Sequence, residues 1–365
     1  MLARQRFLIA APASQIRCPA AGEIVCESGS QKEWPPREGD VGSHLILHDF
    51  PSPGVEAAWR DFLERVDIPA HYNSPEFFRE PHLRANRPFA VLALQKERVA
   101  GVLTGIHEGD QVSCGTDTRP QICLDKTIDL APPVEALVQG LLAEATSARL
   151  LTVYSWTLLD PFLRYGFRFR PMEGVVVLDL TQGKERVLKQ FDTNRRRNIR
   201  LSIQRNVEVS EPKNEEEVAI LYEIYKDWCK RKNRSPIPYE MELAISRSTR
   251  ANRKTLLARV EGKVVAGTVI RFFTGGLVEY SRNNSLPEYL KFRPNDLLQW
   301  KAIEWACDEG FLRYSMGGSS PFHLKFGGQI VPIFRYRLDR TWLRRHDLRE
   351  AILDVGRRLR PKQRH

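Results

Sequence analysis

The hydrophobic residues of this chain follow two alternating periodicities. Stretches with apolar residues at every third or fourth position are typical of helices, and short stretches of alternating or clustered apolar residues are typical of strands. The helices are expected at 55–66, 132–147, 158–165, 184–205, 218–230, 240–248 and 294–309, with a helix start near 73–78. The strands are expected at 45–47, 111–114, 150–156, 175–180, 277–282, 311–316 and 330–338, with hairpins at 89–106 and 255–273. This alternation predicts an α/β fold with mixed sheets.

The two expected hairpins resemble each other in sequence. VLALQKERVAGVL at 91–103 is similar to LLARVEGKVVAGTV at 256–269, and each hairpin returns from a charged tip as Val-Ala-Gly. In both copies a strand, a helix, another strand and an aromatic–glycine pair follow. Because similarity between segments about 160 residues apart indicates a repeated unit, we expect a duplicated α/β domain.

These patterns divide the chain into five segments. Residues 1–44 are rich in Ala, Pro, Gly, Ser and charge, which predicts a poorly ordered leader. We expect a first domain at 45–180, a basic linking helix and strand at 181–213, a second domain at 214–340, and a basic C-terminal helix at 341–365.

The net charge of +11 favours acidic partners such as phosphorylated cofactors, nucleic acid or anionic lipid surfaces. The linking helix concentrates this charge at Arg195, Arg196, Arg197, Arg200 and Arg205. That run is either a solvated basic face or a clamp for phosphates or another polyanion.

The C-terminal segment is also basic, with six arginines between positions 344 and 360. Its apolar residues at helical spacing are Leu348, Ile352, Val355 and Leu359. Such a helix either packs on the body of the protein or touches an anionic surface such as a membrane.

Several classes of function lack their sequence signals. The six cysteines are widely spread without a CxxC pair, which argues against a disulfide scaffold or a zinc site and favours a reducing, cytoplasmic setting. No metal site is expected. There is no apolar run long enough for a transmembrane helix. No Gly-x-Ser-x-Gly, HExxH or dinucleotide-binding pattern supports a hydrolase, a metalloprotease or a dehydrogenase.

One stretch, 293–328, combines several signals of a ligand site. Pro294 begins an expected helix, Gly310 ends it, and a short strand follows. The strand leads into Gly317-Gly318-Ser319-Ser320-Pro321, and Lys325 comes just after this loop. A loop of small residues at the C-terminal end of a strand is a common binding site in α/β proteins.

The order hairpin, strand, helix, strand and Tyr165-Gly166-Phe167 resembles the GNAT acyltransferase fold. Two such units joined by a basic helix resemble the Fem-type peptidyltransferases and, more closely, the FemAB-like acetyltransferases of the CelD/BcsL type in bacterial envelope and exopolysaccharide systems. The segments that carry this resemblance are 196–200, 207–209, 294–300, 310, 314–320 and 324–328, within a similarity that runs from about residue 50 to about residue 340. The resemblance implies two tandem GNAT-like domains, of which the second, at 214–340, would be catalytic.

The same resemblance implies a function. It is the transfer of an acyl group, acetyl or similar, from acyl-CoA as co-substrate to an amine or hydroxyl of an envelope or exopolysaccharide precursor. The acceptor would be a phosphorylated, nucleotide-linked or lipid-linked sugar or peptide. The enzyme would be cytoplasmic, with possible contact between the protein and the inner face of the membrane as a further expectation.

The resemblance also implies site residues. The donor would meet the backbone of Gly267, Thr268 and Val269, and the helix start at Arg293 and Asn295 would face its phosphates. The acceptor would be bound by Arg196, Arg197, Asn198, Arg200, Gly317, Gly318 and Ser319. The GNAT phosphate loop, Q/R-x-x-G-x-G/A, is not present before this helix.

The catalytic candidates are Lys325, Tyr280, Tyr314 and Ser315. Lys325 corresponds to the lysine of the Phe-Lys pair in Fem proteins and would hold an oxyanion or a phosphate, unless it is an ordinary surface lysine. Either tyrosine would protonate a leaving thiolate, unless both are core residues. His323 and Glu279 are candidate bases, and strand alternation places Glu279 and Tyr280 on opposite faces of their sheet.

Two other functions stay open on the sequence. One is a tRNA-dependent aminoacyl or peptidyl transferase of the Fem type, the only case in which nucleic acid would be a partner. The long coiled-coil arm of Fem proteins is missing from this chain. The other is a non-catalytic polyanion-binding protein that uses the arginines of 195–205.

Overall fold

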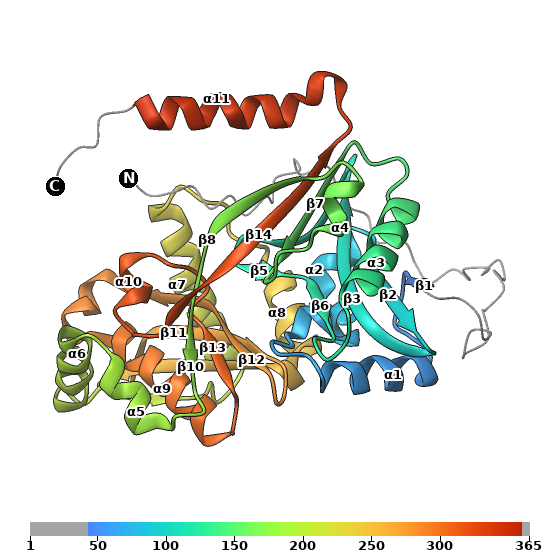
Figure 1. The fold of residues 1–365 in the computed structure, drawn as a ribbon. Helices are drawn as coiled ribbons and strands as arrows, with labels where there is room; N and C mark the ends of the chain where they lie inside the picture. Colours follow the sequence, from blue (N-terminus) through green and yellow to red (C-terminus); the bar gives the residue numbers. More distant parts are fainter. Residues whose placement is uncertain (1–42, 360–365) are drawn as a thin grey trace, which may run out of the picture.

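The computed structural model describes residues 43–359, so the leader expected at 1–44 lies outside the described residues except for its last two positions. Within the described range, strands from both halves of the chain join one mixed sheet with helices on both of its faces (Figure 1). The expected mixed α/β fold class is therefore confirmed.

The first half of the chain, residues 43–179, contains the first eight strands. They are β1 (His44–Leu47), β2 (Pro88–Gln95), β3 (Arg98–Glu108), β4 (Gln111–Thr116), β5 (Arg119–Pro120), β6 (Ile122–Leu124), β7 (Leu150–Ser155) and β8 (Arg168–Asp179). Its helices are α1 (Pro53–Leu63), α2 (Pro81–Arg84), α3 (Ala131–Glu144) and α4 (Pro161–Arg164). The helix start expected near residue 73 forms two 3₁₀ helices instead, η1 (His71–Asn73) and η2 (Pro75–Arg79).

The basic linking segment forms two helices rather than one, α5 (Lys184–Gln190) and α6 (Thr193–Gln204), followed by the short strand β9 (Glu208–Ser210). The break falls at Phe191, which is buried, and at Asp192, whose carboxylate accepts a hydrogen bond from the Asn194 backbone N–H at 2.8 Å. An aspartate in this position caps a new helix, and this explains why the basic run does not continue as one helix.

The second half of the chain, residues 208–339, repeats the order of the first. Its strands after β9 are β10 (Arg253–Val260), β11 (Lys263–Phe272), β12 (Leu277–Ser285), β13 (Arg313–Ser315) and β14 (Gln329–Asp339). Its helices are α7 (Glu215–Arg231), α8 (Tyr239–Ser248), α9 (Pro294–Asp308) and α10 (Pro321–Leu324), with the 3₁₀ helices η3 (Arg250–Asn252) and η4 (Pro287–Phe292). After β14 come η5 (Trp342–Arg344) and α11 (Arg345–Leu359).

Both hairpins have the turns that their sequences predict. Lys96 and Glu97 join β2 to β3, and Glu261 and Gly262 join β10 to β11. All four residues have positive φ, between 48° and 78°. Two consecutive residues with positive φ match the right-handed twist of the flanking strands, as in tight two-residue hairpin loops.

Each half of the chain has helices on both faces of its strands. In the first half, α3 covers one face and α1 the other. In the second half, α9 covers one face and α7 the other. Each half also has one parallel pair of strands, β4 with β7 and β12 with β13, with α3 or α9 in the connection between them. A parallel pair requires such a crossover, and α3 and α9 provide it.

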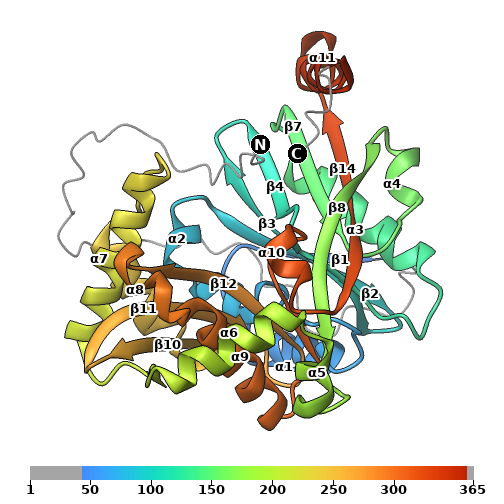
Figure 2. The same ribbon diagram turned by 90° about the vertical axis from the view of Figure 1, so that its left-hand side faces the viewer.

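The two halves exchange their last strands. The strand order is β1-β2-β3-β4-β7-β14-β8-β13-β12-β11-β10-β9, so β14 pairs with β7 of the first half and β8 pairs with β13 of the second. The two exchanged strands also pair with each other, antiparallel, from Gln329 opposite Val177 to Arg337 opposite Arg168. They run side by side between the two halves in Figures 1 and 2. Each half's part of the sheet is therefore completed by a strand from the other half of the chain.

The C-terminal helix α11 follows directly from β14. Asp339, the last residue of β14, accepts hydrogen bonds from the backbone N–H groups of Thr341, His346 and Asp347 at 2.9–3.1 Å. These bonds fix the angle at which α11 leaves the sheet. No helix within residues 43–359 combines the length and the apolar character that a membrane span requires.

The pairing of β8 with β14 depends on a glycine at an irregularity in their register. Gly174 has a φ of 77°, and a Cβ there would overlap the carbonyl oxygen of Val331. The Gly174→Ala variant should therefore lower the midpoint of thermal unfolding clearly. Gly109→Ala is the matched control, because Gly109 also has positive φ (62°) but has no atom within 4 Å of the added Cβ.

In the control variant the free energy of unfolding should fall by only about 1 kcal/mol, which is the cost of an alanine in the left-handed conformation. Gly174→Ala should lose substantially more stability, measured by calorimetry or circular dichroism. Equal losses in the two variants would contradict the importance of this contact.

Candidate active site

The second half contains a gap between two parallel strands. β12 and β13 pair only at residues 277–279 and 313–315, after which β12 continues to Ser285 while β13 ends. The chain leaves β13 through Gly317, whose φ is 67° and whose added Cβ would lie 2.8 Å from the Tyr280 carbonyl oxygen. Glycine is therefore required where the two strands begin to separate.

The exchanged strand β8 holds the loop on the other side of this gap. The Met316 N–H donates to the Val176 carbonyl at 2.8 Å, and the Val176 N–H donates to the Gly318 carbonyl at 3.0 Å. Beyond Ser315 the loop is thus hydrogen-bonded to the first half's last strand and not to β12. This pairing draws the loop away from β12.

Tyr280 and His323 lie on the α9 side of the gap. Their ring centroids are 6.1 Å apart, and a Cβ at Gly318 would lie 2.9 Å from the His323 ring. Burial raises the pKa of Tyr280 and lowers the pKa of His323 to about 4. At neutral pH the phenol is therefore protonated and the imidazole is neutral, with its Nδ1 3.2 Å from the Ser320 hydroxyl.

The other two catalytic candidates lie deeper. Tyr314 is fully buried between β13 and α9, where its hydroxyl accepts a hydrogen bond from Gln299 Nε2 at 2.8 Å. Burial raises the pKa of Tyr314. The Ser315 hydroxyl is also buried and accepts from the Gly317 N–H at 3.3 Å. In this structure Tyr314 packs in the core, and Ser315 shapes the turn that begins the gap.

The start of α9 faces the open part of the gap. Arg293 precedes the helix with a φ of 59° and an exposed side chain. The side chain of Asn295 ties the helix to β12, because its Nδ2 donates to the Ser285 hydroxyl at 3.1 Å, and its Oδ1 is buried without a partner among the described residues. A helix start with an unpaired buried polar atom is suited to binding a polar group of a ligand.

The basic helix α6 packs against this helix start. Arg195 forms an ion pair with the buried Asp296 in the first turn of α9, and Asn198 Nδ2 donates to the same carboxylate at 3.3 Å. The Ser202 hydroxyl lies 2.8 Å and 2.9 Å from the carbonyl oxygens of Phe292 and Arg293. The side chains of Arg195 and Asn198 are therefore occupied by contacts within the protein. The negative charge of Asp296 interacts favourably with the positive end of the α9 dipole.

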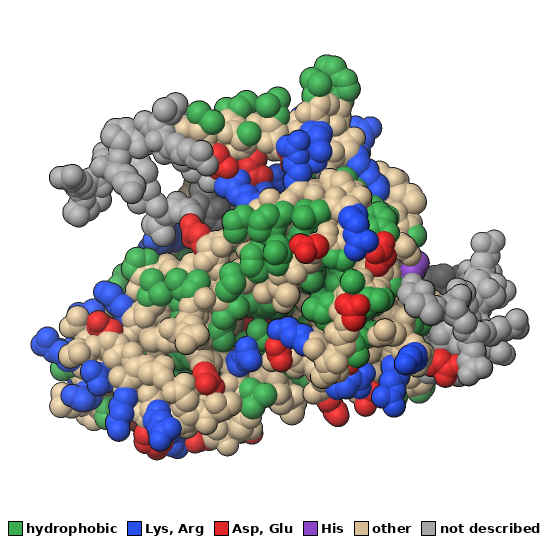
Figure 3. All heavy atoms as spheres, in the orientation of Figure 1, with side chains coloured by type: hydrophobic (Ala, Val, Ile, Leu, Met, Phe, Trp, Pro, Cys, Tyr) green, Lys and Arg blue, Asp and Glu red, His purple; other side chains and the backbone are tan. Residues whose placement is uncertain are grey.

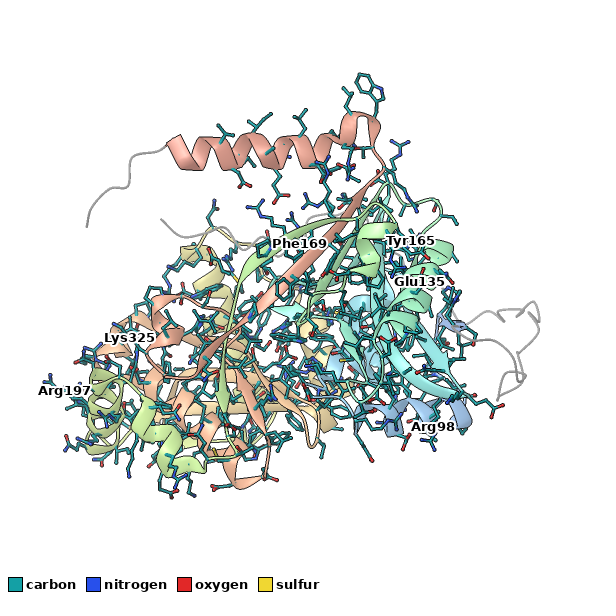
Figure 4. The ribbon with its side chains drawn as sticks, viewed as in Figure 1. Arg98, Glu135, Tyr165, Phe169, Arg197 and Lys325 are labelled. Carbon is teal, nitrogen blue, oxygen red and sulfur yellow. The ribbon has the colours of Figure 1, made fainter. Side chains whose placement is uncertain are left out.

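Other cations of α6 point outward. Arg197 and Arg200 are exposed. Arg196 is partly buried, and its guanidinium donates a hydrogen bond to the Thr193 hydroxyl at 3.3 Å. Lys325 is exposed at the end of α10, and its backbone carbonyl accepts from the Asp192 N–H at 2.8 Å. Figure 3 shows Lys and Arg side chains along this edge of the second half, and Figure 4 labels Arg197 and Lys325 there. The structure thus brings Lys325 close to α6, next to the loop Gly317–Ser319.

The three residues expected to meet the donor through their backbone lie inside the sheet. Gly267, Thr268 and Val269 belong to β11, which pairs with β10 on one side and β12 on the other. The Thr268 hydroxyl donates to the Arg282 carbonyl at 3.0 Å. Because ladder hydrogen bonds flank β11 on both sides, the backbone nearest the gap belongs to β12 beyond Tyr280.

The opposite face of β12 contains a buried ionic cluster that the sequence did not predict. Glu279 is buried and lies 3.0 Å from Nδ1 of His71, which belongs to the first half. Arg119, also of the first half, lies 3.6 Å from the same carboxylate. Glu279 and Tyr280 therefore face opposite sides of the sheet, as expected. The partners of Glu279 are far away in sequence, and no local pattern in the sequence marks them.

The cluster continues along β11. Arg271 is buried and forms an ion pair with the buried Glu80, and its Nε donates to the Asn252 carbonyl at 3.3 Å. Burial alone would raise the pKa of Glu80, but the neighbouring Arg271 lowers it below its ordinary value. Since these pairs join the first half to the second, they fix the two halves against each other on this face of β12.

Three comparisons place this geometry among known proteins. Residues 193–325, from the start of α6 to Lys325, match the family model of the acetyltransferase (GNAT) domain. No curated protein sequence matches the chain.

Among solved structures, the chain is similar to FemX, with a TM-score of 0.61, 13% identity and coverage of 81% of this chain and 98% of that one. It is similar to the C-terminal domain of a protein assigned as a lysylphosphatidylglycerol synthetase from Agrobacterium fabrum, with a TM-score of 0.54, 13% identity and coverage of 84% and 97%. It is also similar to a tandem GNAT protein from the clavulanic acid biosynthesis pathway, with a TM-score of 0.53, 13% identity and coverage of 82% and 99%. These similarities show a tandem GNAT fold.

The buried His71 should make stability depend on pH. Burial, and then the charge of Arg271, lower the pKa of His71 to about 4 from its ordinary 6.5, although Glu279 acts in the opposite direction. The unfolded chain therefore takes up a proton at pH values where the folded protein does not. The free energy of unfolding should fall as the pH falls from 6.5 to 4, by up to about 1.4 kcal/mol per pH unit from this group.

The His71→Gln variant should show a flatter pH dependence of its urea-unfolding midpoint over this window. The exposed His48 is the control position. In His48→Gln the free energy of unfolding should still fall between pH 6.5 and pH 4 as it does in the unchanged protein. An unchanged slope in His71→Gln would contradict the buried neutral state of this histidine.

Proposed function

The chain has the tandem GNAT fold of FemAB-like proteins, and on this basis we propose that it is an acyltransferase. The proposed reaction moves an acyl group, acetyl or similar, from acyl-CoA to an amine or hydroxyl of an envelope or exopolysaccharide precursor. The acceptor carries a phosphate, as a nucleotide-linked or lipid-linked sugar or peptide.

The observation that carries the proposal is the gap between β12 and β13. It lies beside the start of α9, and it is bordered by a loop of small residues, Gly317 to Ser319, which adds little side-chain bulk of its own. An acyl thioester in this gap has its carbonyl near Tyr280 and the turn at Gly317. The phosphates of the donor lie toward Arg293 and Asn295, where the positive end of α9 and an arginine favour anions.

The side chains at the gap provide the required proton transfers. The acceptor nitrogen or oxygen attacks the thioester carbonyl carbon, and the carbon–sulfur bond breaks. In the proposed reaction the neutral imidazole of His323 takes the proton from the acceptor, and the protonated phenol of Tyr280 gives its proton to the leaving thiolate. The lowered pKa of His323 and the raised pKa of Tyr280 fix these protonation states at neutral pH, but they make His323 a weaker base and Tyr280 a weaker acid than in water. Lys325 is exposed beside α6, so its ammonium suits a phosphate of the acceptor better than a buried oxyanion.

One observation favours the second candidate, an aminoacyl or peptidyl transferase of the Fem type that uses charged tRNA. Asp296 places a carboxylate at the helix start where a CoA diphosphate would bind, and Arg195 is the cation paired with it among the described residues. The arginines on the outer face of α6 suit a nucleic-acid backbone as well as the phosphates of CoA. A purely polyanion-binding protein would use the same arginines but would have no need for the gap.

The acyl-CoA proposal predicts binding of acetyl-CoA or a longer acyl-CoA to the purified protein. Isothermal titration calorimetry should give a dissociation constant that rises about tenfold or more in Arg293→Ala, because a charged hydrogen bond to a phosphate is removed. Arg98→Ala is the control, since Arg98 is an exposed arginine at the β2–β3 turn, far from this gap (Figure 4). Native mass spectrometry of the purified protein should also detect a co-purified acyl donor.

Absence of binding to every acyl-CoA tested would reject this donor. If charged tRNA then bound with a steep salt dependence, and this binding was lost in an Arg196, Arg197 and Arg200 triple alanine variant, the second candidate would replace the first.

The acceptor side is tested through Lys325. With an acceptor identified by release of free CoA thiol, Lys325→Ala should raise the KM for that acceptor about tenfold or more, while kcat changes less, because a phosphate contact present in the bound substrate is lost. Lys232, an exposed lysine at the end of α7, provides the matched control Lys232→Ala. Full turnover with an unchanged KM in Lys325→Ala would remove this residue from the site.

A further inference from the structure

The C-terminal helix α11 stands outside the two halves. Figures 1 and 2 show it beyond the ends of β7, β8 and β14, and its ion pairs with the sheet run to arginines of β8 and β14. Its contacts with the body are ionic rather than apolar. The helix therefore does not hide its apolar residues in the core.

All three acidic residues of α11 face the body. Glu350 forms ion pairs with Arg335 at 2.5 Å, with Arg337 at 2.7 Å and with Arg170. Asp354 lies 2.8 Å from Arg170. Burial alone would raise the pKa of Glu350, but Arg335 and the other arginines lower it.

Asp347 lies 2.9 Å from Arg344 and 3.6 Å from Arg168. With Glu350 and Asp354 it forms a row at the helical spacing i, i+3 and i+7, which is one face of α11. That face is fixed against the arginines of β8 and β14, so the helix cannot rotate without breaking several ion pairs. The opposite face is held toward solvent.

The outward side of α11 and its leading turn are apolar. Trp342 is 85% exposed and Ile352 is 63% exposed. The remaining residues, each at least half exposed, are Leu343, Leu348, Leu353 and Val355. Leu348, Ile352 and Val355 share one stripe by their spacing of four and three residues. Figure 3 shows apolar side chains along the outer edge of this helix. A continuous apolar surface of this kind marks an interaction site.

The charges beside this stripe are all positive. Arg345 and Arg349 are exposed, and the sequence continues after Val355 with Arg357, Arg358 and Arg360 and no acidic residue. Because the acids of α11 are all directed to the body, its free side presents apolar residues bordered by cations. A second copy of this chain would bring the same cations against each other with no acid to pair with them. An anionic lipid surface would instead satisfy both the apolar stripe and the arginines.

We propose that α11 binds the surface of an anionic membrane, lying in the plane of the headgroups with Leu348, Ile352 and Val355 directed into the lipid. Trp342 and Leu343 anchor the start of the helix, where an exposed tryptophan matches the preference of this side chain for the membrane interface. Arg345 and Arg349 contact the lipid phosphates. This inference is independent of the acyl-transfer proposal, because it concerns a different surface and its test measures no turnover.

Sedimentation with vesicles tests the inference on the full chain. Vesicles of phosphatidylcholine with roughly a third phosphatidylglycerol should bind the protein, and vesicles of phosphatidylcholine alone should bind it much more weakly. Binding should weaken at least about tenfold in the Leu348→Ser, Ile352→Ser and Val355→Ser triple variant, because each buried apolar group contributes to membrane affinity.

The matched control changes three exposed apolar residues elsewhere, Leu158→Ser, Leu163→Ser and Ile220→Ser. Circular dichroism verifies that both triple variants are folded, and the control should bind vesicles like the unchanged protein. The Arg345→Glu and Arg349→Glu double variant should lose the preference for phosphatidylglycerol.

Equal vesicle binding by the two triple variants would overturn the proposal, as would no binding of the unchanged protein to anionic vesicles. A lipid-free dimer that the α11 triple variant abolishes would assign the stripe to a second copy and would also overturn it. Analytical ultracentrifugation of the same preparations measures this outcome.

Discussion

The exchange of β8 and β14 is the constraint on which the rest of the structure depends. β13 has only three residues, and its place in the sheet relies on β12 on one side and β8 on the other. The loop beyond β13 is held by Val176 of β8, so the width of the gap in the second half is set by the first half. The buried pairs Arg271 with Glu80 and Glu279 with His71 hold the same two halves together on the other face. A site of this kind requires both halves even if only one contains the chemistry.

The linking helix α6 has two roles that its sequence does not separate. Its arginines look alike in the sequence, but the fold assigns them differently. Arg195 forms an ion pair with Asp296, and its guanidinium carbon lies 4.5 Å from the centroid of the Phe322 ring. These two contacts join α6 to the start of α9 and to α10. Arg197 and Arg200 remain exposed and available for an anionic substrate. Some arginines of a basic run therefore stabilise the fold and others remain free to bind a ligand. The burial of each side chain distinguishes the two roles.

Sequence patterns predicted local structure well and long-range contacts poorly. The Val-Ala-Gly hairpins, the turn at Lys96 and Glu97 and the left-handed Gly310 at the end of α9 are encoded within a few residues, and the structure has all of them. The break of the basic helix at Asp192 was missed because the arginine run continues across it. The exchange of β8 and β14, and the pairing of His71 with Glu279, join residues far apart in the chain, and no periodicity reports such contacts. The roles of Lys325 and Tyr280 stay predictions, because reactivity depends on a substrate that shapes the gap.

The position of α11 bears on what the acceptor is. β14 completes the sheet of the first half and, through Asp339, sets the angle of α11. The helix lies at one end of the molecule, whereas α6 and α10 lie away from it on the second half (Figure 1). If the outward face of α11 rests on lipid, the gap and Lys325 face the aqueous phase at some distance from the headgroups. A nucleotide-linked acceptor then reaches the gap without hindrance, while a lipid-linked acceptor needs a head group long enough to extend from the bilayer. If both proposals hold, the position of α11 would therefore favour the nucleotide-linked acceptor of the two.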